Sequence, residues 1–331
     1  PMPTSTSDFS AAHSGACQAQ FHRRWNHLFD PHVRALAWLL DAPDLLDPQA
    51  AQWQGKIASY ADPDLATWLT ELEQLPEKLQ ALHCYIGSLP SPRLGLYAEK
   101  LLAFYFEQRQ ILVAHSVQVR ASKNDTIGEF DFLLQLNGGL VHWEFATKFY
   151  LLETSGGSLQ PDDFLGPNLA DSLGAKMQKI LQRQLVLSQH PAAQIHLNEP
   201  VTSAQALIKG WLFYPDAHLR LPAVLGVSAN ACRGYWCSLS ALPLEPSARY
   251  QILPRQRWLA PAKTALEQTL SAEDARLALS KHFAGDAAPV LLATLRPEGD
   301  YGLETARGFV VPDDWAGRAA AQRHLTVGKA G

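Results

Sequence analysis

Apolar residues recur at helical spacing in the first quarter of the chain. Within residues 31–40, Val33, Leu36, Ala37 and Leu40 fall three or four positions apart, which predicts a helix with one buried face. The Asp-Pro-Asp sequence at 62–64 is a good start for a second helix over the next ten residues. We therefore expect residues 15–92 to form a helical N-terminal region. It ends at the Gly- and Pro-containing segment 87–92.

The pattern changes twice more along the chain. Residues 93–190 read as a helix, three strands, a loop and a helix, and we treat them as the core. Residues 191–318 hold short strand-like runs with a helix between them, so we expect a mixed, β-rich C-terminal region packed on the core. The strand-like runs and the helix are 207–214, 290–295, 308–311 and 272–283. Residues 1–14 are expected to be a disordered N-terminus, and 319–331 a surface helix end and loose tail.

The centre of the chain alternates like a hairpin. Phe130, Phe132, Leu134 and Leu136 fall on one face of the first strand, and Glu129, Asp131, Leu133 and Gln135 on the other. Asn137-Gly138 is a strong two-residue turn signal, because both turn positions need a positive φ. With this turn, Leu136 faces Gly139 and Asp131 faces Glu144. A turn at Gly138-Gly139 would instead make the two carboxylates diagonal neighbours.

One face of the predicted hairpin thus carries Glu129, Asp131, Glu144 and Lys148, while Trp143, Phe145 and Phe149 join the apolar face. Like charges directly opposite each other destabilise a sheet, so the two carboxylates call for a cation. Mg²⁺ and Mn²⁺ prefer such oxygen ligands. The alternative is an ordinary solvated hairpin face on which Lys148 pairs locally.

Two helices flank the hairpin. In residues 94–108, Glu99 lies on the apolar stripe, where it is either a further acidic ligand or a glutamate at the edge of the stripe. After the hairpin, Asn168 is a suitable N-cap, and Gln184 falls within the apolar face of the helix that follows. That helix also has a basic stripe that either contacts phosphates or is simply solvated, formed by Lys176, Lys179 and Arg183.

Composition limits the remaining choices. The chain has 331 residues and a net charge of −4, so any nucleic acid would have to bind at a local basic patch. No signal peptide and no run of 18 apolar residues occurs, and the cysteines form no zinc-like motif. We therefore expect a cytoplasmic protein that does not enter membranes and has free thiols at its four cysteines, Cys17, Cys84, Cys232 and Cys237.

The order of elements resembles the PD-(D/E)XK nuclease superfamily, in which a helix with Glu, a strand with Asp and a strand with Glu-X-Lys precede a second helix. GEFDFLL resembles one type of second strand in that superfamily. HWEFATKFYL, LGPNLADSLGAK and RGFVVPDDW resemble an uncharacterised bacterial family assigned to it. The resemblance implies an α/β (α+β) fold with a restriction-endonuclease-like mixed sheet flanked by helices. It also implies Mg²⁺- or Mn²⁺-dependent hydrolysis of nucleic acid, DNA rather than RNA.

The same resemblance assigns roles to individual residues. Asp131, Glu144 and Lys148 would be catalytic, with Glu99, Asp131 and Glu144 as metal ligands and Glu129 and Gln184 in support. Lys176, Lys179 and Arg183 would bind the substrate backbone. One position departs from the pattern, because Ala146 stands where the superfamily has its lysine. The alternative function is therefore a catalytically decayed nuclease-like protein that binds nucleic acid or a protein partner.

Overall fold

A computed structural model describes residues 15–87, 93–216, 219–222 and 225–327. The expectation of a disordered N-terminus at 1–14, most of the 87–92 boundary and the end of the tail at 328–331 lie outside the described residues. The helices comprise α1 (Ala16–Trp25), α2 (Pro31–Asp41), α3 (Leu65–Gln74), α4 (Pro76–Ile86), α5 (Leu94–Gln108), α6 (Leu173–Lys179), α7 (Ala272–Gly285) and α8 (Trp315–Val327). No described helix has both the length and the apolar character needed to cross a lipid bilayer.

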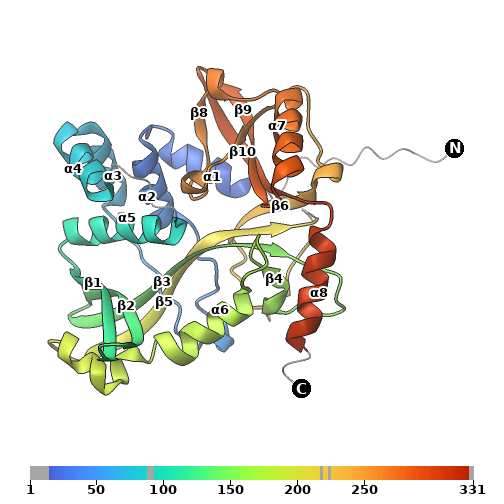
Figure 1. The fold of residues 1–331 in the computed structure, drawn as a ribbon. Coiled ribbons are helices and arrows are strands. Elements are labelled where there is room, and N and C mark those ends of the chain that lie inside the picture. The colour runs from blue at the N-terminus through green and yellow to red at the C-terminus, as the bar shows by residue number, and fades with distance from the viewer. Residues whose placement is uncertain (1–14, 88–92, 217–218, 223–224, 328–331) are drawn as a thin grey trace.

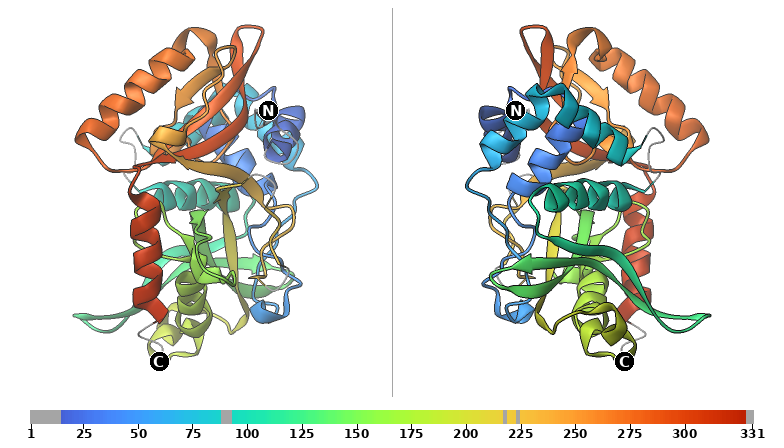
Figure 2. Two further views of the ribbon diagram at one scale, coloured as in Figure 1. Left: turned by 90° about the vertical axis from the view of Figure 1, so that its right-hand side faces the viewer. Right: turned by 90° about the vertical axis from the view of Figure 1, so that its left-hand side faces the viewer.

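A mixed sheet of 10 strands runs through the molecule (Figures 1 and 2). Its main path has the order β1-β2-β3-β5-β6-β10-β9-β7, with β4 paired to β3 and β8 to β10. The strands are β1 (Leu112–Ser122), β2 (Asp125–Leu136), β3 (Gly139–Leu152), β4 (Phe164–Leu165), β5 (Val201–Tyr214), β6 (Cys232–Ser238), β7 (Arg249–Ile252), β8 (Lys263–Ala265), β9 (Val290–Glu298) and β10 (Tyr301–Val311). The expected fold class, a mixed sheet flanked by helices with a helical N-terminal region and a β-rich C-terminal region, is confirmed.

The sheet does not stop at the expected border between residues 190 and 191. β3 pairs in parallel with β5 from Leu140↔Val201 to Leu151↔Phe213, and β5 continues in parallel to β6. Parallel neighbours need a crossover, and the segment with α6 supplies it between β3 and β5. Core and C-terminal region therefore share one hydrogen-bonded sheet.

Helices cover both faces of this sheet (Figure 1). On one face, the largest cluster of buried apolar side chains joins α2 and α5 to β2, β3 and β5, with Phe106 of α5 against Phe132 and Trp143. On the other face, Met177 of α6 belongs to a second cluster with Tyr150 of β3. The sheet is thus buried on both sides over β3, which explains why almost every residue of that strand is buried.

Two details of the hairpin can be compared with expectation. The turn at Asn137-Gly138 is confirmed, since both residues have positive φ (52° and 78°) and Leu136 pairs with Gly139. The placement of Phe130 beside Phe132 is wrong. Phe130 packs edge-on against His142, with ring centroids 4.8 Å apart, and belongs to a separate cluster on the far side of the sheet. Strict alternation breaks between Phe130 and Phe132, where β2 leaves its regular pairing with β3.

The segment after the hairpin also differs from expectation. The helix begins at Leu173, and Ser172, not Asn168, is its N-cap: the Ser172 hydroxyl accepts a hydrogen bond from the N–H of Ala175. After seven residues the α-helix passes into a π-helical turn, Ile180–Gln184, here called η3. At the C-terminus, α8 begins at Trp315, a buried residue, and Ala319 is buried too, so the chain beyond 318 starts as a packed helix rather than a loose tail.

The expectation of four free thiols is wrong for two of them. Cys17 of α1 and Cys232 of β6 form a disulfide across a sequence separation of 215 residues. Folding brings the two backbones to a Cα–Cα distance of 5.5 Å, a proximity that sequence spacing could not reveal. Cys84 and Cys237 are free thiols.

Candidate metal centre

The candidate site lies where β2 and β3 separate. Their antiparallel register runs from Leu136↔Gly139 to Phe132↔Trp143 and ends there. At the next position the side chain of Asp131 reaches across, and its Oδ2 accepts a hydrogen bond from the backbone N–H of Phe145 at 2.8 Å. β3 meanwhile continues beside β5, with Glu144 paired to Ala206. Counting back from the turn holds as far as Phe132↔Trp143, and the expected pair Asp131↔Glu144 is not part of the register, because the Asp131 side chain bonds to the backbone of β3 there.

Three carboxylates converge at this point. Glu99 of α5 and Glu129 and Asp131 of β2 each offer an oxygen atom, and these atoms all lie within 4.8 Å of one another. Glu99 is held by the hydroxyl of Ser116, which donates to its Oε1 at 2.5 Å. Ser116 itself lies in β1 with a φ of 51°, a left-handed conformation that is uncommon away from glycine. The expectation that Glu99 points from its helix toward the hairpin agrees with this arrangement.

Glu144 is the most buried acidic residue of the group. Its side chain is 2% exposed, its Oε1 accepts a hydrogen bond from Nε2 of Gln184, and its Oε2 has no hydrogen-bond partner among the described residues. Burial, followed by the repulsion of Asp131, raises the pKa of Glu144 to about 9. A buried carboxylate oxygen without a donor is costly, so this atom is a natural place for a cation to bind.

The pKa values of the other three carboxyl groups are also raised. Burial raises the pKa of Glu99 to about 7, and burial also raises the pKa values of Glu129 and Asp131. In Glu129, the charge of Asp131 adds to the effect. Each carboxyl therefore favours its protonated form in this partly desolvated space, and a hard divalent cation with oxygen ligands would stabilise the charged forms in place of the protons.

His142 lies beside Glu144 and does not act as its counter-charge. Its Nε2 is 3.9 Å from Glu144 Oε2, and neither ring nitrogen has a hydrogen-bond partner among the described residues. Burial lowers the pKa of His142 to about 4, so the imidazole is neutral near pH 7. Apart from their common strand face, no sequence pattern indicated that His142 and Glu144 would lie this close.

Lys176 of α6 is the cation that acts on the acidic residues. Its charge lowers the pKa values of both Asp131 and Glu144, opposing the effect of burial on each, while burial lowers its own pKa. Its Nζ donates to Oε1 of Gln184 at 3.5 Å, and Nε2 of the same amide donates to Oε1 of Glu144. Lys176 and Gln184 are eight residues apart with the π-helical turn Ile180–Gln184 between them, so regular helical spacing did not indicate that they would meet.

The other predicted cations lie elsewhere. Nζ of Lys148 donates to Oδ2 of Asp171 at 2.5 Å, and among the described residues it forms no ion pair with the four carboxylates. It lines a separate cavity of about 290 Å³ together with Arg255. Lys179 and Arg183 are exposed, so the expected basic stripe divides into one inward and two outward cations.

Ala146, at the position where the superfamily has its lysine, is buried in the cluster that includes Met177. Met177 lies on α6, the helix that also carries Lys176. Three carboxylates within 4.8 Å of one another, with the buried Oε2 of Glu144 next to Asp131, form a donor set that fits a Mg²⁺ or Mn²⁺ ion.

Comparison with known proteins gives a family and no closer relative. The family model "Domain of unknown function (DUF1853)" matches residues 34–311, which include all elements of the candidate site. No curated protein and no solved structure matches the chain.

Proposed function

Since the chain belongs to the DUF1853 family, we propose its function from the site itself: a Mg²⁺- or Mn²⁺-dependent nuclease of the PD-(D/E)XK type. Its substrate would be nucleic acid, DNA rather than RNA. The reaction would add water across a P–O bond of the backbone, leaving a phosphate monoester at one end and a hydroxyl at the other. The observation that carries the proposal is the convergence of Glu99, Glu129 and Asp131 within 4.8 Å of one another where two strands separate, with Glu144 interacting with Asp131 beside them.

The acidic residues have distinct parts in this proposal. Asp131 and Glu144, on neighbouring strands, would hold the ion, with Glu99 from the helix completing the set and Glu129 in support. A bound divalent ion would lower the pKa of a coordinated water and neutralise charge on the phosphate. Hydrogen bonds from Phe145 N–H to Asp131 and from Gln184 to Glu144 fix both carboxylates in position.

We infer that Lys176 takes the part that Glu-X-Lys enzymes give to a strand lysine. It is half-buried, it stabilises the charged forms of both Asp131 and Glu144, and Gln184 lies next to its Nζ. From there its ammonium group would orient the attacking water or stabilise charge on the phosphate in the transition state. Lys179 and Arg183, exposed on the same helical segment, would bind the backbone of the substrate. Lys148, held by Asp171, would contribute to catalysis only after leaving that partner.

A second candidate function is a nuclease-like protein without catalysis, which binds nucleic acid or a protein partner. Two observations favour it: Ala146 is buried at the usual lysine position, and Lys148 is engaged by Asp171. The two candidates differ in one measurable respect, because only the enzyme needs both the carboxylates and Lys176 for turnover.

The test is cleavage of a mixture of single- and double-stranded DNA and RNA with Mg²⁺ or Mn²⁺. Asp131→Asn and Glu144→Gln are compared with Asp125→Asn, an exposed carboxylate on the same strand β2 as Asp131. We expect the site variants to lose at least about 100-fold in rate and the control to retain the wild-type rate. Absence of cleavage together with calorimetric binding of Mn²⁺ would support the non-catalytic candidate. Absence of both would overturn the proposed metal centre.

A further inference from the structure

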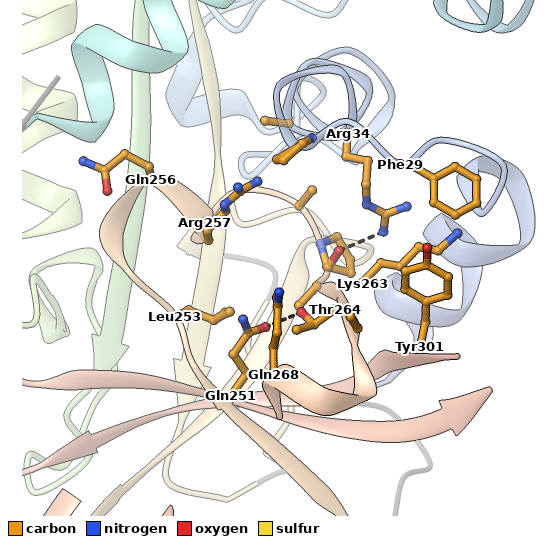
Figure 3. Close-up of a pocket in the computed structure, with 16 residues that line it drawn as sticks. Phe29, Arg34, Gln251, Leu253, Gln256, Arg257, Lys263, Thr264, Gln268 and Tyr301 are labelled. Carbon is orange, nitrogen blue, oxygen red and sulfur yellow. Dashed lines mark hydrogen bonds between the residues drawn. The ribbon is translucent and has the colours of Figure 1, made fainter. Parts of the chain in front are cut away.

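A second cavity lies far along the sheet from the acidic site, between the N-terminal helices and the C-terminal strands. It has a volume of about 320 Å³ and is bordered by the start of α2, by the 3₁₀ turn Arg255–Arg257 (η8), by β8 and by the start of β10. Figure 3 shows Arg34, Arg257 and Lys263 around this hollow, with the rings of Phe29 and Tyr301 beside Lys263. None of the residues that line it is acidic.

Arg34 is the buried cation of the cavity. It is 4% exposed, and its guanidinium donates three hydrogen bonds to backbone carbonyls, those of Trp25 (3.2 Å), Leu28 (3.1 Å) and Pro261 (3.0 Å). A guanidinium has five N–H donors, so two are left without an acceptor among the described residues. Carbonyl dipoles fix the orientation of the group and do not neutralise its charge. Burial lowers the pKa of Arg34 to about 10, which leaves it charged at neutral pH.

Two further cations share the cavity with it. Nζ of Lys263 donates to the carbonyl of Asn26 at 2.6 Å and lies 3.5 Å from the ring centre of Phe29. Arg257 has an exposed side chain and stands at the opening. Among the described residues, none of Arg34, Arg257 and Lys263 forms an ion pair. The charge of Arg34 disfavours that of Lys263, and the charge of Arg257 disfavours that of Arg34.

The carboxylates whose charges favour the charged form of Arg34 are those of Glu304 and Glu73, and that of Asp30 acts on Arg257 and pairs with His83. Glu304 forms a two-point ion pair with Arg307, at 2.6 and 2.9 Å, and accepts a further hydrogen bond from the N–H of Ala262. Glu73 accepts the backbone N–H groups that precede α2. Neither residue lines the cavity. The three cations therefore face a common space without a counter-charge inside it.

We propose that this cavity binds a small organic anion, with its phosphate or carboxylate group held between Arg34, Arg257 and Lys263. Oriented guanidinium groups bind both kinds of anion through paired hydrogen bonds. The volume is at the lower end of the range for small-molecule sites, which excludes a polymer from the cavity itself. Phe29 and Tyr301, with ring centroids 5.6 Å apart, offer an aromatic wall for the uncharged part of the ligand.

The polar groups on the opposite wall are suited to neutral parts of such a ligand. Thr264 donates its hydroxyl to Oε1 of Gln251 at 2.5 Å, which orients the amide of Gln251 and leaves its N–H₂ group as a donor at the cavity wall. Gln268 adds a second amide. A ligand with hydroxyl or carbonyl groups near its anionic end matches this wall better than an inorganic ion does.

The test measures binding of inorganic phosphate, adenosine monophosphate and citrate to the full chain by calorimetry, at constant ionic strength and with EDTA to remove divalent metal. Arg257→Gln is compared with Arg255→Gln, which removes another exposed arginine of the same 3₁₀ turn that does not line this cavity. Binding of at least one probe is expected. It should weaken about tenfold or more in Arg257→Gln and in Lys263→Gln, and less than about twofold in Arg255→Gln.

The pattern among probes identifies the anion: tighter adenosine monophosphate or phosphate indicates a phosphate ester, and tighter citrate indicates a carboxylate. Asp131→Asn should bind the probe as wild type does, which separates this site from the proposed metal centre. No binding of any probe up to roughly 10 mM would overturn the inference, since a built site should exceed that affinity. Equal losses in Arg257→Gln and Arg255→Gln would overturn it as well, because they would show a general effect of surface charge.

Discussion

The carboxylate of Asp131 takes the place of a missing strand partner: its Oδ2 accepts the backbone N–H of Phe145 at 2.8 Å, one step beyond the last regular pair of the hairpin. The same side chain lies within 4.8 Å of the acidic groups of Glu99 and Glu129. The Asp131 carboxylate thus accepts a backbone hydrogen bond and also belongs to the acidic cluster. A substitution that removes the charge of Asp131 therefore changes the hydrogen bond to Phe145 and the charge of the acidic cluster.

The first prediction concerns stability. Glu144→Gln should stabilise the metal-free protein, by about 1–2 kcal/mol at pH 8. A carboxyl whose pKa is raised in the folded state, here to about 9, contributes fully below its unfolded pKa near 4.5 and loses stability as the pH rises through that interval. A neutral amide avoids this loss and can still accept from Gln184. Thermal unfolding of the wild type and of Glu144→Gln at pH 5 and pH 8 measures the difference in stability. The variant should have the higher Tm at pH 8 only. A decrease in Tm at pH 8 would contradict the assignment of a destabilising charge.

The second prediction concerns the pH dependence of metal affinity. Near pH 7 the metal-free site holds protons, because the pKa values of Glu144 and Glu99 are raised to about 9 and about 7. An ion must displace these protons, so Mn²⁺ affinity should rise with pH, by up to about tenfold per pH unit between pH 7 and 8.5 and more steeply below pH 7, where two protons are displaced. Calorimetry in two buffers of different ionisation enthalpy counts the protons released. A dissociation constant that does not change with pH would show that the ion does not bind at Glu144 and Glu99.

The third prediction separates the two lysines. Lys176→Gln should lower kcat about 100-fold while leaving KM within a few-fold, since its charge acts on Asp131 and Glu144. Lys148→Gln should reduce kcat far less, because its partner in this structure is Asp171. Lys179→Gln, on the exposed side of α6, should raise KM more than it changes kcat. Steady-state cleavage rates for the three variants decide the assignment, and a larger loss in Lys148→Gln than in Lys176→Gln would reverse it.

The fourth prediction concerns the disulfide. Cys17→Ser should destabilise the oxidised protein by about 2–4 kcal/mol, because the bond closes a long loop of the unfolded chain. Adding a reductant should lower the Tm of the wild type to a value near that of the variant. Cys84→Ser, which removes an exposed free thiol, is the matched control and should leave Tm unchanged in both conditions. Equal Tm values for wild type and Cys17→Ser without reductant would show that the bond contributes nothing.

Local signals predicted the hairpin well, and long-range contacts explain what was missed. Asn137-Gly138 predicted the turn and hence the register as far as Phe132 and Trp143, because strand register follows from turn geometry. Ser172 competed with Asn168 for the helix start, and its additional acceptor, Asp162, is ten residues away in sequence. The proximity of Cys17 to Cys232 depends on how the N-terminal helices pack on the sheet, which no pattern within a single element encodes.

The helix after the hairpin shows the same limit at the site. Regular spacing placed Lys176 with Lys179 and Arg183 on a basic stripe, whereas burial turns Lys176 toward the acidic residues and leaves the other two in solvent. The π-helical turn Ile180–Gln184 then changes the periodicity just before Gln184. The orientation of α6 about its axis depends on apolar packing against β3. A helical wheel drawn from the sequence contains no information on that packing.

The shared pairing of β3 with β5 has a consequence for any attempt to divide the protein. Glu144 lies on a strand whose parallel neighbour comes from beyond residue 200, so a fragment ending at 190 would expose an unpaired, largely apolar strand edge. Such a fragment should be insoluble when produced alone. If the two fragments are synthesised together, the fragment that contains β5 should pair with β3 and keep the first fragment soluble. The solubility of the first fragment would then measure the assembly of the split protein.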